Sequence, residues 1–224
     1  MTTAKPMQIS MKSPMNSPMM HTNQSVARAI HPNEDSPRIA PLPAESMRPA
    51  WLATLARIPG DGLKGAGFPR NVLGTIMHNP DTFGPFLEFW VSAKSSMSLS
   101  VREQELVILR MAVLYASDYV WKHHVLVGRE FGVTDAELDM LESGEFAHFA
   151  SMRERALLAL TDELVENRTI QRDAWDTFAH ELDERALVDL VSLVSQYVFF
   201  ALMNNAFQVA IEPALEKVRG LSRA

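Results

Sequence analysis

Hydrophobic residues are densest in two parts of this chain, one near its middle and one near its end. In the middle part, residues 100–115 are apolar on nearly every side of a helix, which predicts a buried central helix. Ser100 and Glu103 form the capping-box pattern that starts such a helix. A second helix is predicted over Tyr119–Phe131, with Gly132 in the position that ends it. The chain is therefore expected to be organised around this helical pair.

Apolar residues recur at helical spacing through the rest of the chain as well. The predicted helices are Trp51–Ile58, Asn71–Met77, Thr82–Met97, Thr134–Leu141, Met152–Glu166, Arg172–Leu182 and Asp183–Ile211. The aromatic side chains of the third of these are expected to face the core, together with a leucine: Phe83, Phe86, Leu87, Phe89 and Trp90. No alternation of apolar and polar residues is long enough to predict a strand. The predicted fold class is all-α.

Two regions are predicted to lie outside the helices. Residues 1–33 contain no acidic residue, lack periodicity and are rich in Met, Ser and Pro, so residues 1–37 are predicted to be a disordered tail before a single domain at 38–224. The segment Asp61–Pro69 is glycine-rich and is read as a connecting loop that could also serve substrate entry. A signal peptide or a membrane span is not expected, because the apolar stretches are interrupted by polar residues.

Composition narrows the possible chemistry. The chain has 224 residues, 47% of them hydrophobic and 21% charged, which is ordinary for a globular protein. It contains no cysteine, which excludes disulfides, thiolate nucleophiles and thiol-dependent peroxidase chemistry. The formal net charge of −6 argues against a nucleic-acid partner. A cytoplasmic enzyme fits these properties.

The strongest candidate chemistry is a carboxylate and an imidazole in apolar surroundings. Glu105 lies near the start of the buried central helix, and His124 lies midway along its partner. Such a pair is suited to proton transfer. Two alternatives remain open: Glu105 could pair with Arg102 on its own helix, and His124 could be a hydrogen-bonded core residue without catalytic function.

The neighbouring His123 points about 100° away from His124 around the helix, so it could serve packing, an interface or a ligand contact. Because adjacent histidines diverge on a helix, a metal site that uses His123 or His124 together with Glu105 is disfavoured. The motif H-E-x-x-H is also absent from the sequence. No metal and no cofactor is predicted.

Three motifs resemble a known family. The run L-S-x-x-E-x-E-L-V-I-L-R, the following Y-x-W-x-x-H and the later G-V-T-x-x-E-L resemble the carboxymuconolactone decarboxylase family, which includes the alkylhydroperoxidase D-like (AhpD-like) proteins. A late D-E-L…W…Q-Y…N-A-F pattern extends the likeness to about residues 38–215. The resemblance implies an AhpD-like helical bundle built around a central helical pair. It leaves the reaction open, because one fold supports several chemistries.

The resemblance carries over to individual residues. In the peroxidase branch a glutamate precedes the histidine of C-x-x-C-x-x-x-H by nineteen positions, and Glu105 and His124 match these two residues. The two cysteine positions fall on Ser117 and Val120, so the redox pair is missing. Decarboxylase-like members read Y-E-W-x-x-H in the second helix, and here Val120 replaces the glutamate. The resemblance thus implies a retained proton-relay pair and one missing acid.

These observations lead to a functional expectation. We expect a cofactor-independent decarboxylase, lyase or isomerase that acts by proton transfer on a small carbonyl or lactone acid, as in aromatic-compound degradation. In this interpretation His124 moves the proton, and Glu105 orients the imidazole ring of His124 and sets its pKa. The residues expected to bind the substrate are Tyr119, Trp121, His123, Gln196 and Tyr197. The alternative is a non-enzymatic family member that serves assembly or ligand binding; a dry pocket beside the pair, closed by Trp121, would favour the enzyme.

The chain is also expected to be a homo-oligomer. Its two most apolar helices would both be central, and a body of this size has limited room to cover the aromatic residues that flank them. Burial of this surplus between subunits would solve the problem. The family resemblance implies a trimer or a hexamer.

Overall fold

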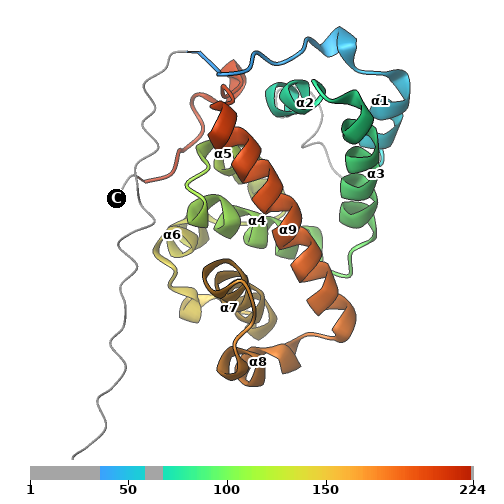
Figure 1. Cartoon of the computed structure of the whole chain (residues 1–224). Coiled ribbons are helices and arrows are strands. Elements are labelled where there is room, and N and C mark those ends of the chain that lie inside the picture. The colour runs from blue at the N-terminus through green and yellow to red at the C-terminus, as the bar shows by residue number, and fades with distance from the viewer. Residues whose placement is uncertain (1–35, 59–67, 223–224) are drawn as a thin grey trace, which may run out of the picture.

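The computed structural model describes residues 36–58 and 68–222, and these residues form helices and connecting turns without a strand (Figure 1). The α-helices are α1 Pro49–Leu55, α2 Arg70–Ile76, α3 Pro80–Ser96, α4 Val101–Leu114, α5 Asp118–Glu130, α6 Asp135–Ser143, α7 Met152–Asn167, α8 Arg172–Phe178 and α9 Glu184–Phe207. Short 3-10 helices lie at Ala44–Ser46, Phe146–His148, Ala179–Glu181 and Pro213–Leu215. The all-α prediction is confirmed. The predicted tail and most of the glycine-rich loop fall outside the described residues.

The predicted helical pair is α4 and α5. Ser100 and Glu103 form the expected capping box at the start of α4, and residues 104–112 of this helix are all buried. Three residues separate the end of α4 from the start of α5, so α5 folds back against α4. Gly128 of α5 permits close packing, because a Cβ there would lie 3.2 Å from a methyl group of Leu109 on α4. After α5, Gly132 adopts a φ of 84° and reverses the chain, as predicted.

The longest helix, α9, joins the two sides of the molecule. It packs against α2, α3, α4, α5 and α7, with α1–α3 on one side of it and α6–α8 on the other (Figure 1). By length and composition α9 is the one helix in the described part of the chain that could cross a membrane, with a mean hydropathy of 1.8. Its contacts with five other helices explain why its sequence is so apolar, because a central core helix also needs an apolar surface.

Three predicted helices end at least three residues earlier than expected, and the first of them, predicted over Trp51–Ile58, ends at Leu55. The helix predicted over Arg172–Leu182 is α8 followed by a separate 3-10 turn at Ala179–Glu181. The final helix was predicted to reach Ile211, but α9 ends at Phe207 because Gln208 adopts a φ of 50°. The chain turns there and runs back toward α2 and α5, which places the segment around Glu212 beside the helical pair. Apolar periodicity alone does not reveal a reversal of this kind.

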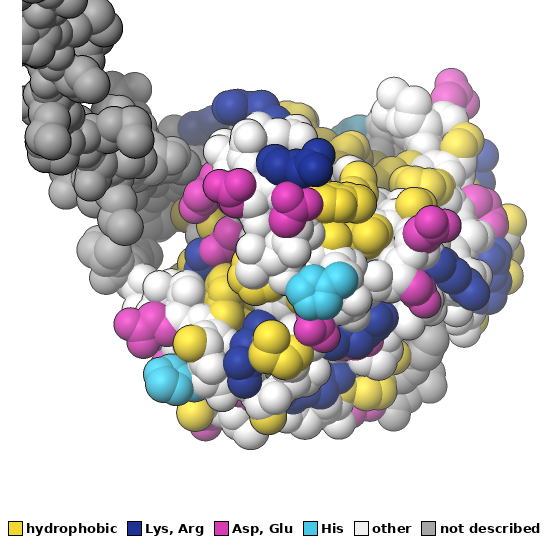
Figure 2. Space-filling model, turned by 90° about the horizontal axis from the view of Figure 1, so that it is seen from below, with side chains coloured by type: hydrophobic (Ala, Val, Ile, Leu, Met, Phe, Trp, Pro, Cys, Tyr) yellow, Lys and Arg dark blue, Asp and Glu magenta, His cyan; other side chains and the backbone are white. Residues whose placement is uncertain are grey.

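Most of the aromatic residues of α3 lie in the core, with one exception. Phe83, Leu87 and Trp90 are buried as predicted, whereas Phe89 is 56% exposed. The prediction for Phe89 was wrong because its position lies about 100° around the helix from Trp90, away from the buried face. Other large apolar side chains are exposed as well: Leu52, Leu126, Met152, Trp175, Val188, Val191 and Leu202. On the face shown in Figure 2, a group of hydrophobic side chains lies among interspersed acidic and basic ones.

Candidate active site

The structure brings Glu105 and His124 together from the two central helices. Oε2 of Glu105 lies 2.6 Å from Nδ1 of His124, and the glutamate side chain is completely buried. The second carboxylate oxygen, Oε1, accepts a hydrogen bond from Nζ of Lys94 at 3.0 Å. Lys94 comes from the last turn of α3. The three side chains therefore form a buried cation–carboxylate–imidazole row.

The charges in this row follow from its surroundings. Burial alone would raise the pKa of Glu105, but the neighbouring Lys94 and His124 lower it to about 2. Burial lowers the pKa of His124, and Lys94 lowers it further, against the opposing effect of Glu105. At neutral pH the carboxylate is therefore ionised and the imidazole is neutral.

The partner that the sequence suggested for Glu105 is not the one found. Arg102 bonds instead to Glu137 on α6 and Glu154 on α7, so it connects three helices. The sequence analysis missed Lys94. One signal could have indicated it, because Lys94 follows the inward-facing Trp90 by four positions and so lies on the same side of α3.

Tyr197 completes the group on the other side of the imidazole. Because the ionised Glu105 can only accept hydrogen bonds, the proton of neutral His124 lies on Nδ1, and Nε2 is an acceptor. The Tyr197 hydroxyl lies 3.2 Å from this Nε2 and can donate to it. Burial raises the pKa of Tyr197 to about 12, against the opposing effect of Lys94, so the phenol stays protonated at neutral pH. Both imidazole nitrogens thus have partners.

A second polar cluster lies one position along α5. The Tyr119 hydroxyl donates to Oε1 of Glu212 at 2.7 Å, and His123 Nε2 lies 2.8 Å from Oε2 of the same carboxylate. The backbone N–H of Asn71 donates to Glu212 as well. Burial would raise the pKa of Glu212, but the hydrogen bond and charge of His123 lower it overall. Burial and the adjacent Glu212 raise the pKa of Tyr119 well above its ordinary value.

Glu212 was also missed by the sequence analysis. It lies beyond the last helix and 89 positions from His123, so no local pattern connects it with the helical pair.

One cavity adjoins both clusters. Its volume is about 70 Å³, which is room for more than one water molecule. Its polar lining residues are Lys94, Glu105, Tyr119, His123, His124, Tyr197 and Asn204. Its apolar walls are Ile58, Pro69, Val72, Trp90, Val101, Val120, Val127 and Phe200. A mostly apolar cavity with a few convergent polar groups has the character of a small-molecule site.

Two groups in the cavity wall lack a hydrogen-bond partner among the described residues. They are the indole N–H of Trp90 and the side-chain oxygen of Asn204, in residues that are 5% and 3% exposed. Buried polar atoms nearly always have a hydrogen-bond partner, so each is suited to a water or a ligand. Within the described residues, no group of three or more histidines and acidic residues could hold a metal ion.

The comparisons with known proteins agree with the fold and the helical pair. Residues 80–163 match the model of the carboxymuconolactone decarboxylase family, and this segment contains α3, α4 and α5. The match covers less than half of the chain, and it shows that this segment is similar to the family. The chain contains no cysteine, so it lacks the redox cysteines of the peroxidase branch. The matched segment holds Lys94, Glu105 and both central histidines, whereas Tyr197 and Glu212 lie beyond it. A search of the curated proteins gives no match to the chain.

Solved structures show the same fold. The debrominase Bmp8 is 17% identical, with a TM-score of 0.65 over 79% of this chain and 92% of that one. A cysteine-to-alanine variant of Bmp8, solved with 2,3,4-tribromopyrrole, matches equally well. An uncharacterized peroxidase-related protein from Silicibacter sp. TM1040 is 15% identical, with a TM-score of 0.63 over 83% of this chain and 94% of that one. A protein of unknown function from Agrobacterium tumefaciens, described as a proposed antioxidant defence protein AhpD, is 18% identical. Its TM-score is 0.55 over 60% of this chain and 92% of that one.

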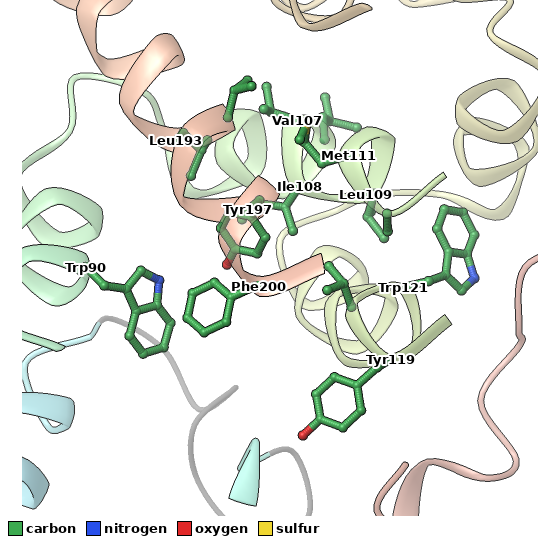
Figure 3. Close-up of a cluster of buried hydrophobic side chains, with 14 of the residues drawn as sticks. Trp90, Val107, Ile108, Leu109, Met111, Tyr119, Trp121, Leu193, Tyr197 and Phe200 are labelled. Atoms are coloured by element: carbon green, nitrogen blue, oxygen red, sulfur yellow. The ribbon is translucent and has the colours of Figure 1, made fainter. Parts of the chain in front are cut away.

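Two of the residues that the sequence predicted to bind the substrate do not line the cavity. Trp121 is completely buried and lies apart from Trp90, Tyr197 and Phe200, as Figure 3 shows, so it does not close the pocket. It follows Tyr119 by two positions, which places it on the other side of α5. Gln196 is buried, but it neither lines the cavity nor joins a network, because its amide group has no partner among the described residues. The family position occupied by Val120 does face the cavity.

Proposed function

We propose that this protein is a cofactor-independent lyase or isomerase that transfers a proton at a carbon next to a carbonyl group. The substrate would be a small carbonyl or lactone acid, and loss of CO₂ from such an acid is one form of the reaction. The observation that supports this proposal is the ionised, completely buried Glu105 at 2.6 Å from a neutral His124 in the wall of a cavity. A fixed carboxylate makes the neighbouring neutral imidazole a stronger base, because it stabilises the imidazolium that forms when the proton is taken up.

The proposed mechanism uses only side chains of this chain. The imidazole group of His124 takes up the proton that leaves the substrate carbon, and Glu105 stabilises the resulting imidazolium. Lys94 holds the carboxylate in its ionised form. The electron pair left on the carbon is delocalised into the carbonyl oxygen as an enolate. The indole N–H of Trp90, which also interacts with the Tyr197 hydroxyl, lies in the same wall and is suited to donate to that oxygen. Return of the proton to a different carbon completes an isomerisation. In a decarboxylation, the imidazole instead takes up the proton of the substrate's carboxyl group, CO₂ leaves as the enolate forms, and the imidazolium returns that proton to carbon.

A decarboxylase is a lyase, so the likeness of residues 80–163 to the carboxymuconolactone decarboxylase family supports a lyase reaction. The sequence also limits which other reactions this protein could catalyse. A thiol-dependent peroxidase reaction is excluded because the chain contains no cysteine. The glutamate of the decarboxylase-like members is replaced by Val120, so one of the acids that decarboxylation would use is missing from α5. This difference gives isomerisation of a carbonyl compound equal standing with decarboxylation in the proposal.

The proposal can be tested with carboxymuconolactone and a panel of small β-keto acids and lactone acids. Loss of the lactone absorbance, release of CO₂ and incorporation of solvent deuterium at carbon would be followed by spectrophotometry, a CO₂ electrode and NMR. We expect turnover of at least one compound, and His124→Ala should lower it by about 10²–10⁴-fold, the range typical of a lost general acid–base group.

The matched control is His148→Ala, because His148 is an exposed histidine on a short surface helix. Its turnover should equal that of the wild-type protein. Circular dichroism and the melting temperature of His124→Ala should stay close to wild type, since a large stability loss would indicate a structural role instead. If no compound is turned over while one or more bind in the cavity, the protein is better described as a non-enzymatic ligand-binding member of the family.

A further inference from the structure

The hydrogen bonds around His124 leave no ring nitrogen directed at a substrate. Nδ1 lies 2.6 Å from Glu105, and Nε2 lies 3.2 Å from the Tyr197 hydroxyl. The two rings are nearly perpendicular, with their centroids 5.2 Å apart. Tyr197 itself lines the cavity. The phenolic oxygen of Tyr197 therefore lies between Nε2 of His124 and a substrate in the cavity, where it could carry a proton from one to the other.

We propose that the Tyr197 hydroxyl is the group that exchanges a proton with the substrate carbon, and that His124 acts behind it as the base and acid that recharges it. This inference rests on the proposed function and adds a catalytic residue to it. Tyr197 would then take part in the reaction as well as line the substrate site. Glu105 and His124, the two residues that the family spacing identifies, would form the part of the proton relay that does not touch the substrate.

The proton count of the proposed reaction balances. In the forward step the substrate C–H proton moves to the phenolic oxygen while the phenolic proton moves to Nε2 of His124. The products are an enolate, a protonated imidazole and an unchanged phenol. In the return step the imidazolium gives its Nε2 proton to the phenolic oxygen, and the phenol gives its proton to a different carbon of the enolate. One proton leaves and one arrives, so the net change is an isomerisation with no other reactant.

The surroundings of Tyr197 suit this role. The charged or titratable groups that face it are Lys94 from α3, Glu105 from α4 and His124 from α5. The Lys94 ammonium lies 5.9 Å from the centre of the tyrosine ring and would stabilise negative charge that develops on the phenolic oxygen. The phenol is buried on the central helix α9, where it lines the cavity and lies beside His124.

The first test needs no substrate. In the protein labelled with ¹⁵N-histidine, His124 should show an unprotonated Nε2 and a protonated Nδ1 at pH 7. Its signals are identified by their absence in His124→Ala. The variant Tyr197→Phe should move the Nε2 signal further from that of a protonated nitrogen, because the hydrogen bond is lost. A protonated Nε2 in the wild-type protein would overturn the proposal, since Tyr197 could then not donate to it.

The second test compares turnover of the compound identified in the panel above. We expect Tyr197→Phe to lower the rate of solvent-deuterium incorporation by about 10²-fold or more, as His124→Ala does. Tyr115→Phe is the matched control, because Tyr115 lies at the end of α4 and does not line the cavity, and its rate should equal that of the wild-type protein. If Tyr197→Phe keeps a rate within about threefold of wild type while His124→Ala is inactive, this inference is wrong and the proposed function stands. If the wild-type protein turns over no compound, both fall.

A second variant covers the case in which Tyr197→Phe does not fold. Site-specific replacement of Tyr197 by 3-fluorotyrosine keeps the hydroxyl group but lowers the pKa of the phenol. The rate should fall at high pH as the phenol ionises, because the ionised form cannot deliver a proton. In the fluorinated protein this fall should begin at lower pH than in the wild-type protein. An unchanged pH profile would overturn the proposal.

Discussion

Replacement of Lys94 by methionine tests the electrostatics on which the site depends. The Lys94 ammonium lies 3.0 Å from the completely buried carboxylate of Glu105, and its own side chain is only 10% exposed. Methionine keeps most of the volume of the lysine side chain but removes the charge. After the substitution, the buried carboxylate has only His124 as a strong partner.

The structure allows an approximate magnitude for the loss. A folded-state pKa of about 2 for Glu105, against an ordinary value of 4.5, corresponds to about 3 kcal/mol of stabilisation of the charged form. Removal of one member of a buried ion pair costs about 3–5 kcal/mol when the other charge stays buried. Since His124 still holds Glu105, we expect Lys94→Met to lower the free energy of unfolding by about 2–3 kcal/mol. For a chain of this size, this is a fall of about 4–12 °C in melting temperature.

Urea denaturation at pH 7 measures the stability loss, and NMR titration of His124 measures the second consequence. Because Lys94 lowers the pKa of His124, this pKa should rise in the variant. The matched control is Lys122→Met, since Lys122 lies 3.7 Å from an aspartate, Asp118, that is 46% exposed. An ion pair of this kind contributes at most about 1 kcal/mol.

A loss below about 1 kcal/mol for Lys94→Met, together with an unchanged pKa of His124, would refute this reasoning. It would mean that Lys94 does not hold Glu105 in its ionised form, and the proposed mechanism would lose its fixed carboxylate.

Three further predictions concern acid stability, the C-terminal segment and assembly. The folded-state pKa of Glu105 is depressed, so the stability that the charged Glu105 contributes to the fold is fully present above about pH 4.5 and should be lost as the pH falls to about 2. Glu105→Gln should remove this part of the pH dependence of the unfolding free energy, measured by urea denaturation. The same pH dependence in the variant as in the wild-type protein would contradict this prediction. Glu212→Gln should cost about 2 kcal/mol, because the carboxylate has two buried hydrogen-bond partners, Tyr119 and His123, and a partly buried one, the backbone N–H of Asn71. The exposed Glu216→Gln should be neutral in the same assay. We also predict a homo-oligomer, a trimer or a pair of trimers, since α9 exposes a row of apolar side chains, and Val191→Glu with Leu202→Glu should lower the mass seen by light scattering. A single-chain mass that does not change on tenfold concentration of the wild-type protein would exclude such an assembly.

The sequence by itself determined the helices and the central pair. Capping boxes and a glycine at the helix end are local signals, because they depend on residues three or four positions apart, and they placed both ends of the pair. The absence of cysteine removed a whole class of reactions without any structure. The meeting of Glu105 and His124 could be anticipated from the family spacing, since both residues lie on adjacent helices joined by a short turn.

The tertiary structure alone decided which other side chains reach that pair. Tyr197 meets His124 across 73 positions and Glu212 meets His123 across 89, and no periodicity relates residues so far apart. The same limit explains why Trp121 and Gln196 were assigned to a cavity that they do not line. A helical pattern specifies which face is buried, but a buried face can meet either the packed core or a cavity. The packing of α5, α7 and α9 against α4, and of α3 against α9, makes that choice, and it depends on the whole chain at once.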